Sequence, residues 1–353
     1  MLVSPPDSSS ARAQAGDWLE LNTLAAGRFG YGYDNLTGAL NLQEHAGELL
    51  HEDGSVLEDE ILETKYEEFC DDLLAELEWR AGVLGPLYPF EVVRVGPIWR
   101  LTRRPSGSAD ERAAHDVYVL CLLIAGIRYG FLEGPGVPEY GARSPRAFQI
   151  VAMLLARGLV GGSSSFWMGS PRPEHDGFAA ALGRLVNEMG VGVVKDKPPV
   201  SQAGFNKDAG IDVIAWRGFG DRRPTPIVSY GQVASGNDWR NKSVEATLDS
   251  HFHHWMSDAP VKYYIPAMYI PFMQHENVRR RLRADFDEVA HDASVVLEKR
   301  LGLVLDRLRL VELAPVALPR GVGSDWPLVA EVLRWKAGVL AALRGGSVSA
   351  PAA

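Results

Sequence analysis

Two short apolar runs separated by a polar turn, within residues 207–242, constrain the fold of this chain more than any other feature. The first run, residues 211–216 (IDVIAW), and the second, residues 226–234 (PIVSYGQVA), are rich in β-branched and aromatic residues, so both predict β-strands. The turn between them contains Gly, Arg, Asp and Pro, which favour a reversal of the chain. We therefore expect two neighbouring strands in one sheet.

Asp212 interrupts the first apolar run. A carboxylate in such a strand is costly to bury unless its charge is offset. A metal ion offsets it well, and hard cations such as Mg²⁺ prefer oxygen ligands. The alternative is a structural carboxylate that pairs with an arginine. Asp208, in the loop that enters the strand, is either a second ligand or an ordinary turn residue.

The motif Gly210-Ile211-Asp212, followed by Gln232 on the next expected strand, resembles the core of the PD-(D/E)xK nuclease superfamily, in particular its Mrr-like restriction endonuclease branch. In that branch the Asp binds the metal, and the next strand carries Glu-x-Lys or Gln-x-Lys. This sequence has Ala234 at the lysine position, so we assign the lysine role to Lys242, a little further along the chain. The resemblance covers roughly residues 145–275.

The resemblance implies a restriction-endonuclease-like mixed sheet flanked by helices, in an α/β (α+β) protein. It also implies a Mg²⁺- or Mn²⁺-dependent DNA endonuclease of a restriction or antiphage defence system. Asp212, Gln232 and Lys242 would be catalytic, and Asp212, Asp208 and Gln232 would hold the metal. Their side chains are expected to meet in one cleft, with Lys242 on the helix that follows; if it points away, Lys207 or Arg240 are the alternatives.

The sequence departs from the branch in a second place. A helix of the branch carries Phe-Glu, with the Glu assisting the metal, whereas the matching pair here is Phe148-Gln149. An amide supplies no negative ligand. The alternative function is therefore a catalytically inactive nuclease-fold subunit, a structural or nucleic-acid-binding component of a defence complex.

The domain organisation is expected from composition and from Pro- and Gly-rich breaks. We expect a mostly helical N-terminal domain followed by the nuclease-like domain. The expected parts are a disordered tail over 1–16, the helical domain over 17–138, the α/β domain over 139–314, and a linker, helix and tail over 315–353. The expected helices are 56–83, 113–131, 145–157, 178–189, 239–256, 276–312 and 326–343. The further strands are 90–101, 191–195 and 262–270, and 161–173 is expected to be a loop.

Charged residues give one more candidate surface. The net charge of −9 argues against a broadly basic nucleic-acid-binding surface. A local basic cluster opens the last long helix and is either a set of phosphate contacts or a solvated helix face; it consists of Arg279, Arg280, Arg281 and Arg283. His251, His253 and His254 are either a zinc site or cations at a helix C-terminus.

Two cysteines suggest neither a disulfide framework nor a zinc module and fit a reducing cytoplasm. The first residues lack the apolar core of a signal peptide. The longest apolar stretch, residues 117–127, is too short to cross a bilayer. We therefore expect a cytoplasmic protein with DNA as partner, and with a protein partner or a second copy on the helical N-terminal region.

Overall fold

The computed structural model describes residues 12–27, 30–32, 57–96, 98–134, 137, 144–162, 164–170, 172, 177–197, 210–221, 225–275, 286–318 and 327–345. Over these residues the protein is α+β, with a mostly helical N-terminal part followed by a mixed sheet flanked by helices, which confirms the expected fold class. Among them, no helix has the length and apolar composition needed to cross a membrane.

The chain divides into two compact units. The first comprises Met1–Ala142, His275–Val289 and Leu333–Ala353, and the second comprises Arg143–Gln274 and Ala290–Val332. Both units are discontinuous in sequence, whereas composition breaks predict only continuous domains.

The first unit is built on helices α1 (Arg12–Ala26), α3 (Leu57–Leu84) and α4 (Ala109–Arg128). A three-stranded antiparallel sheet accompanies them, in the order β1 (Tyr31–Gly32), β3 (Ile98–Arg103), β2 (Phe90–Val95). Ser108 begins α4 because its hydroxyl accepts the amide of Glu111, the usual capping contact. The middle of α4 is apolar on all sides and is buried accordingly.

Two expectations for this unit are wrong. Residues 90–101 form a hairpin of two strands, and not one strand, because the chain reverses at Gly96. Residues 12–16 belong to α1 and are largely buried, although their Ala-rich sequence predicts part of a disordered tail. Their burial against the rest of the unit supplies the stabilisation that local sequence does not reveal.

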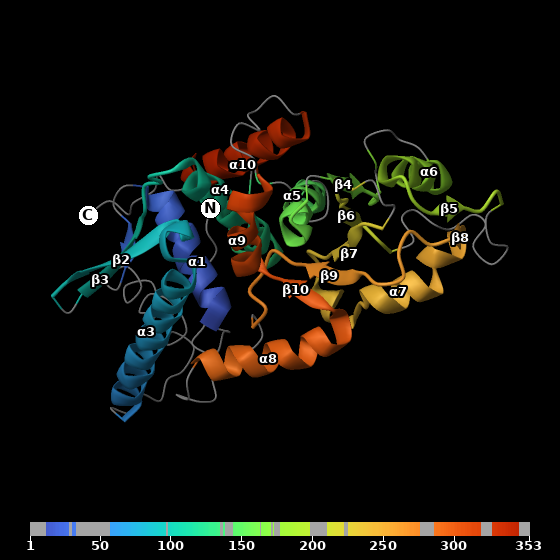
Figure 1. Ribbon diagram of the computed structural model, residues 1–353. Helices are drawn as coiled ribbons and strands as arrows, with labels where there is room; N and C mark the ends of the chain where they lie inside the picture. The colour runs from blue at the N-terminus through green and yellow to red at the C-terminus, as the bar shows by residue number, and fades with distance from the viewer. Residues whose placement is uncertain are drawn as a thin grey trace. The chain divides into compact units, whose positions relative to one another are not determined.

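The second unit contains a five-stranded mixed sheet in the order β10 (Leu303–Leu305), β9 (Ile265–Tyr269), β7 (Ile227–Val233), β6 (Val213–Arg217), β4 (Ser164–Trp167). The pairs β4–β6 and β6–β7 are antiparallel, whereas β7–β9 and β9–β10 are parallel. Figure 1 shows α5 (Ser144–Val160) and α9 (Arg307–Ala317) on one side of this sheet and α7 (Val244–Ser250) on the other. The expected adjacency of the strands near 211–216, 226–234 and 262–270 is therefore confirmed.

Other expectations for this part of the chain are corrected. The segment near 191–195 pairs outside the main sheet, since β5 (Val193–Val194) joins β8 (Met256–Asp258) in a separate two-stranded ribbon. The expected loop 161–173 contains β4. Residues 239–256 are not one helix, because a 3-10 turn (Asn237–Asn241) precedes α7 and a second one (Phe252–Trp255) follows it.

The expected helix over 276–312 is also interrupted. Its described part forms α8 (Phe286–Leu301), the strand β10 and the helix α9, which runs on past Pro315 into the expected linker. Two elements complete the list: α6 (Phe178–Met189) and α10 (Pro327–Gly345). Leu303, Val304 and Leu305 leave the helical path because they pair in parallel with β9.

A buried ionic cluster holds α1 and α3 together in the first unit. The Arg80 side chain is fully buried; its Nη1 lies 2.9 Å from both Asp17 Oδ1 and Glu20 Oε1, and its Nε lies 2.8 Å from Glu76 Oε1. Charges taken out of water are stable only with close partners of opposite sign. The cluster therefore fixes the packing of these helices, and its loss should be costly.

The ionisation of Glu76 makes this cluster sensitive to acid. Burial alone raises the pKa of Glu76, but the charges of Arg80 and His275 outweigh that effect and lower the pKa to about 2. Because this value lies below the ordinary 4.5, the stabilisation by ionised Glu76 is complete above pH 4.5 and is lost as the pH falls towards 2. We expect about 3 kcal/mol of folding free energy to disappear over that interval.

Urea unfolding of the wild type and of Glu76→Gln at several pH values between 6 and 3 measures this loss. The two free energies should differ most at pH 6 and approach each other as the pH falls. Free energies that stay equally far apart over the whole range would contradict the role given to Glu76.

Candidate functional site

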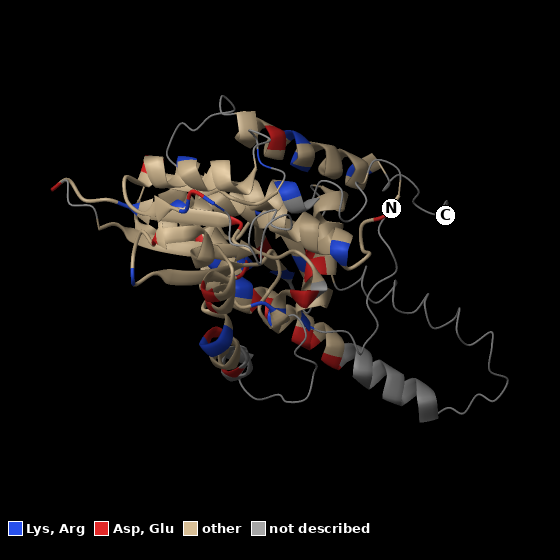
Figure 2. Ribbon diagram, turned by 90° about the vertical axis from the view of Figure 1, so that its right-hand side faces the viewer, with Lys and Arg blue, Asp and Glu red and all other residues tan. Residues whose placement is uncertain are grey.

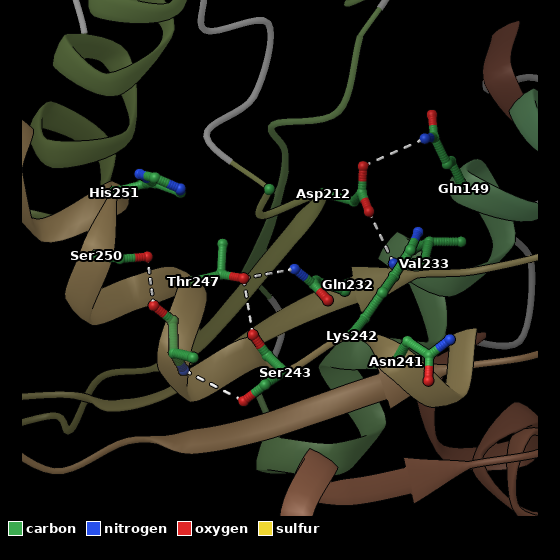
Figure 3. Close-up of a pocket in the computed structure, with 12 residues that line it drawn as sticks. Gln149, Asp212, Gln232, Val233, Asn241, Lys242, Ser243, Thr247, Ser250 and His251 are labelled. Atoms are coloured by element: carbon green, nitrogen blue, oxygen red, sulfur yellow. Dashed lines mark hydrogen bonds between the residues drawn. The ribbon is translucent and has the colours of Figure 1, made fainter. Parts of the chain in front are cut away.

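A polar pocket of about 580 Å³ lies where β6 begins and β7 ends, beside α7. Figure 3 shows its side chains coming from α5, the start of β6, the end of β7 and the segment leading into α7. The lining residues are Gln149, Gly210, Asp212, Gln232, Val233, Asn241, Lys242, Ser243, Ala246, Thr247, Ser250 and His251. The structure thus brings Asp212, Gln232 and Lys242 together around one cavity.

The sequence predicts that Asp212 lies inside a strand, but in the structure Asp212 immediately precedes β6. Its amide donates to the Gly231 carbonyl at 2.9 Å, and its own carbonyl accepts the amides of Met168 and Gly169. The side chain is half-buried, and its Oδ2 accepts the Val233 amide at 2.8 Å. These backbone contacts to both neighbouring segments aim the carboxylate into the pocket.

Gln149 on α5 occupies the position where the resembled branch has an acid. Its Nε2 donates to Asp212 Oδ1 at 3.3 Å, and its Oε1 accepts the indole N–H of Trp167 at 3.2 Å. An indole nitrogen can only donate, so this contact fixes which end of the amide faces Asp212. Gln149 therefore presents N–H to the carboxylate and offers no further oxygen ligand there.

The Gln232 amide is fixed through its nitrogen, whereas the Gln149 amide is fixed through its oxygen. The Nε2 of Gln232 donates to Thr247 Oγ1 at 3.0 Å, and that hydroxyl donates to the Ser243 carbonyl at 2.7 Å. Because the Thr247 hydroxyl has only one proton, it must accept from Gln232, which fixes the amide. The Gln232 side chain is buried, and its Oε1 has no hydrogen-bond partner among the described residues. This oxygen is an unused acceptor at the pocket, and a buried acceptor left unpaired is costly.

Lys242 reaches the pocket from the segment between the 3-10 turn and α7, not from within a helix. It is exposed, and Figure 3 shows its side chain extending towards Asp212. Ala234, at the position where the branch has its lysine, is buried and contributes no charge. Of the alternatives, Arg240 stacks over Trp239 and donates to the Gln274 carbonyl, outside the pocket lining.

Several predicted site residues lie outside the described residues. They are Lys207, Asp208, Arg279, Arg280, Arg281 and Arg283. The three histidines belong to the described residues, but their side chains do not meet at one point. His251 lines the pocket, whereas His253 packs against Tyr230 and Tyr264. Among the described residues, no group of three His, Cys, Asp or Glu side chains is placed to hold a metal ion, which removes the zinc alternative there.

The donors at the pocket nevertheless fit one hard cation. Asp212 supplies a carboxylate, and Gln232, whose buried Oε1 has no partner among the described residues, lines the same cavity. Mg²⁺ commonly binds through one or two carboxylates, completing its shell with water and substrate phosphate. Asp212 and Gln232 are the described residues that would hold such an ion, and Gln149 is excluded by the direction of its amide.

The glycine of the Gly-Ile-Asp motif has a steric reason. Gly210 has φ +75°, and a Cβ placed there would lie 2.5 Å from Thr247 Cγ2 and 3.4 Å from Gln232 Nε2. Gly210→Ala should therefore cost about 1–3 kcal/mol of folding free energy, from backbone strain and overpacking together. Urea unfolding measures the loss.

The exposed Gly218 is the matched control. Nothing lies within 4 Å of a Cβ at Gly218, so Gly218→Ala should change the stability by less than about 0.5 kcal/mol. Adding Thr247→Ser to Gly210→Ala removes the clashing methyl group and keeps the hydroxyl. If this double variant recovers nothing, the steric account of Gly210 is wrong.

Some residues of the site carry no signal in the sequence. Thr247 and Ser243 are ordinary helix-start residues, and only the structure shows that they orient Gln232. Trp167 lies in a segment rich in Gly and Ser, where the sequence predicts a loop. Its short apolar end, Phe166-Trp167, is the one hint of strand β4.

Comparison of the chain with profiles of protein families, with curated proteins and with solved structures gives no significant match.

Proposed function

We propose that this protein is a divalent-cation-dependent endonuclease that hydrolyses phosphodiester bonds of DNA. The observation that carries the proposal is the convergence of Asp212, Gln232 and Lys242 on one pocket from three segments of the chain. The arrangement of the second unit supports it, because α5 and α7 flank a mixed sheet in which β6 and β7 are neighbours, as the motif resemblance leads one to expect. A role in restriction or antiphage defence is proposed on that resemblance alone.

Each side chain has a task in hydrolysis. A bound Mg²⁺ or Mn²⁺ would supply Lewis acidity towards the phosphate and towards a water molecule. Asp212 is oriented by the Val233 and Gln149 N–H groups. Together with Gln232, it would hold the cation at the cavity. The Lys242 ammonium, which extends from the pocket wall, stabilises the negative charge that develops on the phosphate oxygens.

Charge elsewhere gives little general attraction for DNA. In Figure 2, Lys and Arg are scattered among Asp and Glu on the described ribbon, in keeping with the net charge of −9. Affinity for phosphate must then come from local cations such as Lys242 and from the bound metal. Binding of DNA should consequently depend strongly on the divalent cation.

Lys242→Met tests the proposal, with Lys262→Met as its matched control. Both lysines are exposed, but Lys262 is not part of the pocket lining. We expect Lys242→Met to slow cleavage of a supercoiled plasmid in Mg²⁺ by about 10²–10³-fold, the usual cost of removing a group that stabilises transition-state charge. Lys262→Met should cleave as the wild type does. Equal activity of all three proteins would remove Lys242 from the mechanism.

A second function is favoured by one specific observation. The Gln149 amide faces Asp212 with an N–H group, where the resembled branch has an acid. Among the described residues that line the pocket, Asp212 is the only carboxylate. This favours a nuclease-like protein that binds nucleic acid without cutting it. DNA binding with full retention of intact plasmid, in both Mg²⁺ and Mn²⁺, would establish this alternative.

A further inference from the structure

Trp167 connects the site to the rest of the second unit. Its indole N–H donates to Gln149, and Gln149 donates to Asp212. The Trp167 side chain is buried in β4, so its ring has little freedom to move. The orientation of the carboxylate therefore depends on a residue that does not line the pocket.

The backbone at Gly169 shows how closely these groups meet. A Cβ placed there would lie 3.0 Å from Asp212 Oδ1, 3.0 Å from Trp167 Nε1 and 3.1 Å from Gln149 Nε2. Three polar atoms from three elements thus surround one glycine. A side chain at this position would make these groups shift by a few tenths of an ångström, so the three groups are closely packed.

The contacts continue beyond Trp167. The guanidinium of Arg146 lies over the Trp167 ring, with Cζ 4.6 Å from the ring centroid. The same guanidinium binds Glu331 of α10 at two points, Nε to Oε1 at 2.6 Å and Nη2 to Oε2 at 3.3 Å. A planar guanidinium can stack and bind a carboxylate in a fork at the same time, so it holds the indole in place.

We propose that Trp167 and Arg146 are positioning residues for Asp212, and that Glu331 at the start of α10 sets their geometry. The expected effect on cleavage rests on the proposed nuclease function. The contacts that link Glu331 through Arg146 and Trp167 to Asp212 do not depend on that function. Partners in the shell behind metal ligands typically contribute 10–100-fold to affinity or activity. Displacement of the start of α10 would then lower the activity of a site that α10 does not line.

Trp167→Phe is the first test, because it keeps an aromatic ring for Arg146 and removes the indole N–H together with part of the ring. We expect cleavage in Mg²⁺ to fall by about 10–100-fold. Trp335→Phe is the matched control, since the buried Trp335 Nε1 has no hydrogen-bond partner in the described part of the chain. Its cleavage rate should equal that of the wild type. A Trp167→Phe protein that cleaves within twofold of the wild type would overturn the proposal.

The second test reads the contacts without reference to activity. The indole N–H resonance of Trp167, identified by its loss in Trp167→Phe, should shift in Gln149→Met and in Glu331→Gln. It should not shift in Lys336→Gln, which breaks another α10 ion pair, that with Asp116. If the wild type does not cleave DNA, the nuclease proposal fails while this resonance still decides the positioning. A resonance unmoved by Glu331→Gln would overturn the link to α10.

Discussion

Asp212→Ala is expected to abolish divalent-cation-dependent cleavage, with a loss of more than about 100-fold. Residues behind metal ligands already account for 10–100-fold, so removal of the anionic ligand itself should exceed that range. The fold should persist. The substitution leaves the Val233 amide and the Gln149 amide beside an open pocket, where water can replace the carboxylate, at a cost of about 1 kcal/mol.

Asp249→Ala is the matched control, because Asp249 is an exposed acid on α7 outside the pocket lining. Cleavage rates and thermal midpoints of both variants, with and without Mg²⁺, separate the two roles of Asp212. A stable, inactive Asp212→Ala protein that has lost any Mg²⁺-dependent rise in midpoint supports the cation site. An active variant destabilised by about 3–5 kcal/mol would instead identify Asp212 as a member of a buried ion pair.

Arg80→Met should produce a large loss of stability, about 3–5 kcal/mol. The substitution leaves Asp17, Glu20 and Glu76 buried without the guanidinium that lies within 2.9 Å of each of them. Uncompensated buried carboxylates must either take up protons or open the structure to water. Urea unfolding at pH 7 measures the difference, and the loss should shrink as the pH falls towards 2, where Glu76 takes up a proton in the wild type.

The ion pair of Arg94 with Glu78 provides the comparison. Its side chains are 60% and 47% exposed, so Arg94→Met should cost less than about 1 kcal/mol. If Arg80→Met does not fold, Arg80→Lys keeps the charge and loses the fork geometry, and it should fall between the two. Similar losses for Arg80→Met and Arg94→Met would show that the buried cluster does not stabilise the first unit.

Sequence patterns predict the centre of the sheet because its strands have a strong local signal. The runs at 211–216 and 226–234 are β-branched and aromatic, and the tyrosine-rich segment that becomes β9 has the same character. The glycine and carboxylate of the motif lie where the site forms. What local sequence misses is that the strand begins at Val213, two residues later than expected, since the Asp212 carbonyl accepts amides from the segment after β4.

Elements that depend on distant partners are not predictable in this way. Leu303, Val304 and Leu305 continue a helix-like apolar pattern and become a strand only because β9 offers them an edge. The strand β8 is too short to carry a pattern, and β5, which the sequence does predict, pairs with β8 and not with the main sheet. The same holds for α1, whose start is buried by its packing and not marked by its composition.

The candidate site also has a part that local sequence predicts and a part that depends on distant residues. Asp212, Gln232 and Lys242 could be proposed from residue type and spacing. The directions of the Gln149 and Gln232 amides could not, because each is fixed by a donor or acceptor distant in sequence, Trp167 in one case and Thr247 in the other. These directions decide which amide oxygen is left without a hydrogen-bond partner, so they matter as much for the chemistry as the identity of the residues.

Cleavage of a supercoiled plasmid by the wild-type protein tests the nuclease proposal most directly. The protein is incubated with the plasmid in Mg²⁺, in Mn²⁺ and in EDTA, and nicked and linear products are followed over time. We predict products in the presence of either cation and none in EDTA. A plasmid that stays supercoiled in both cations, while the protein binds it, would contradict the nuclease proposal.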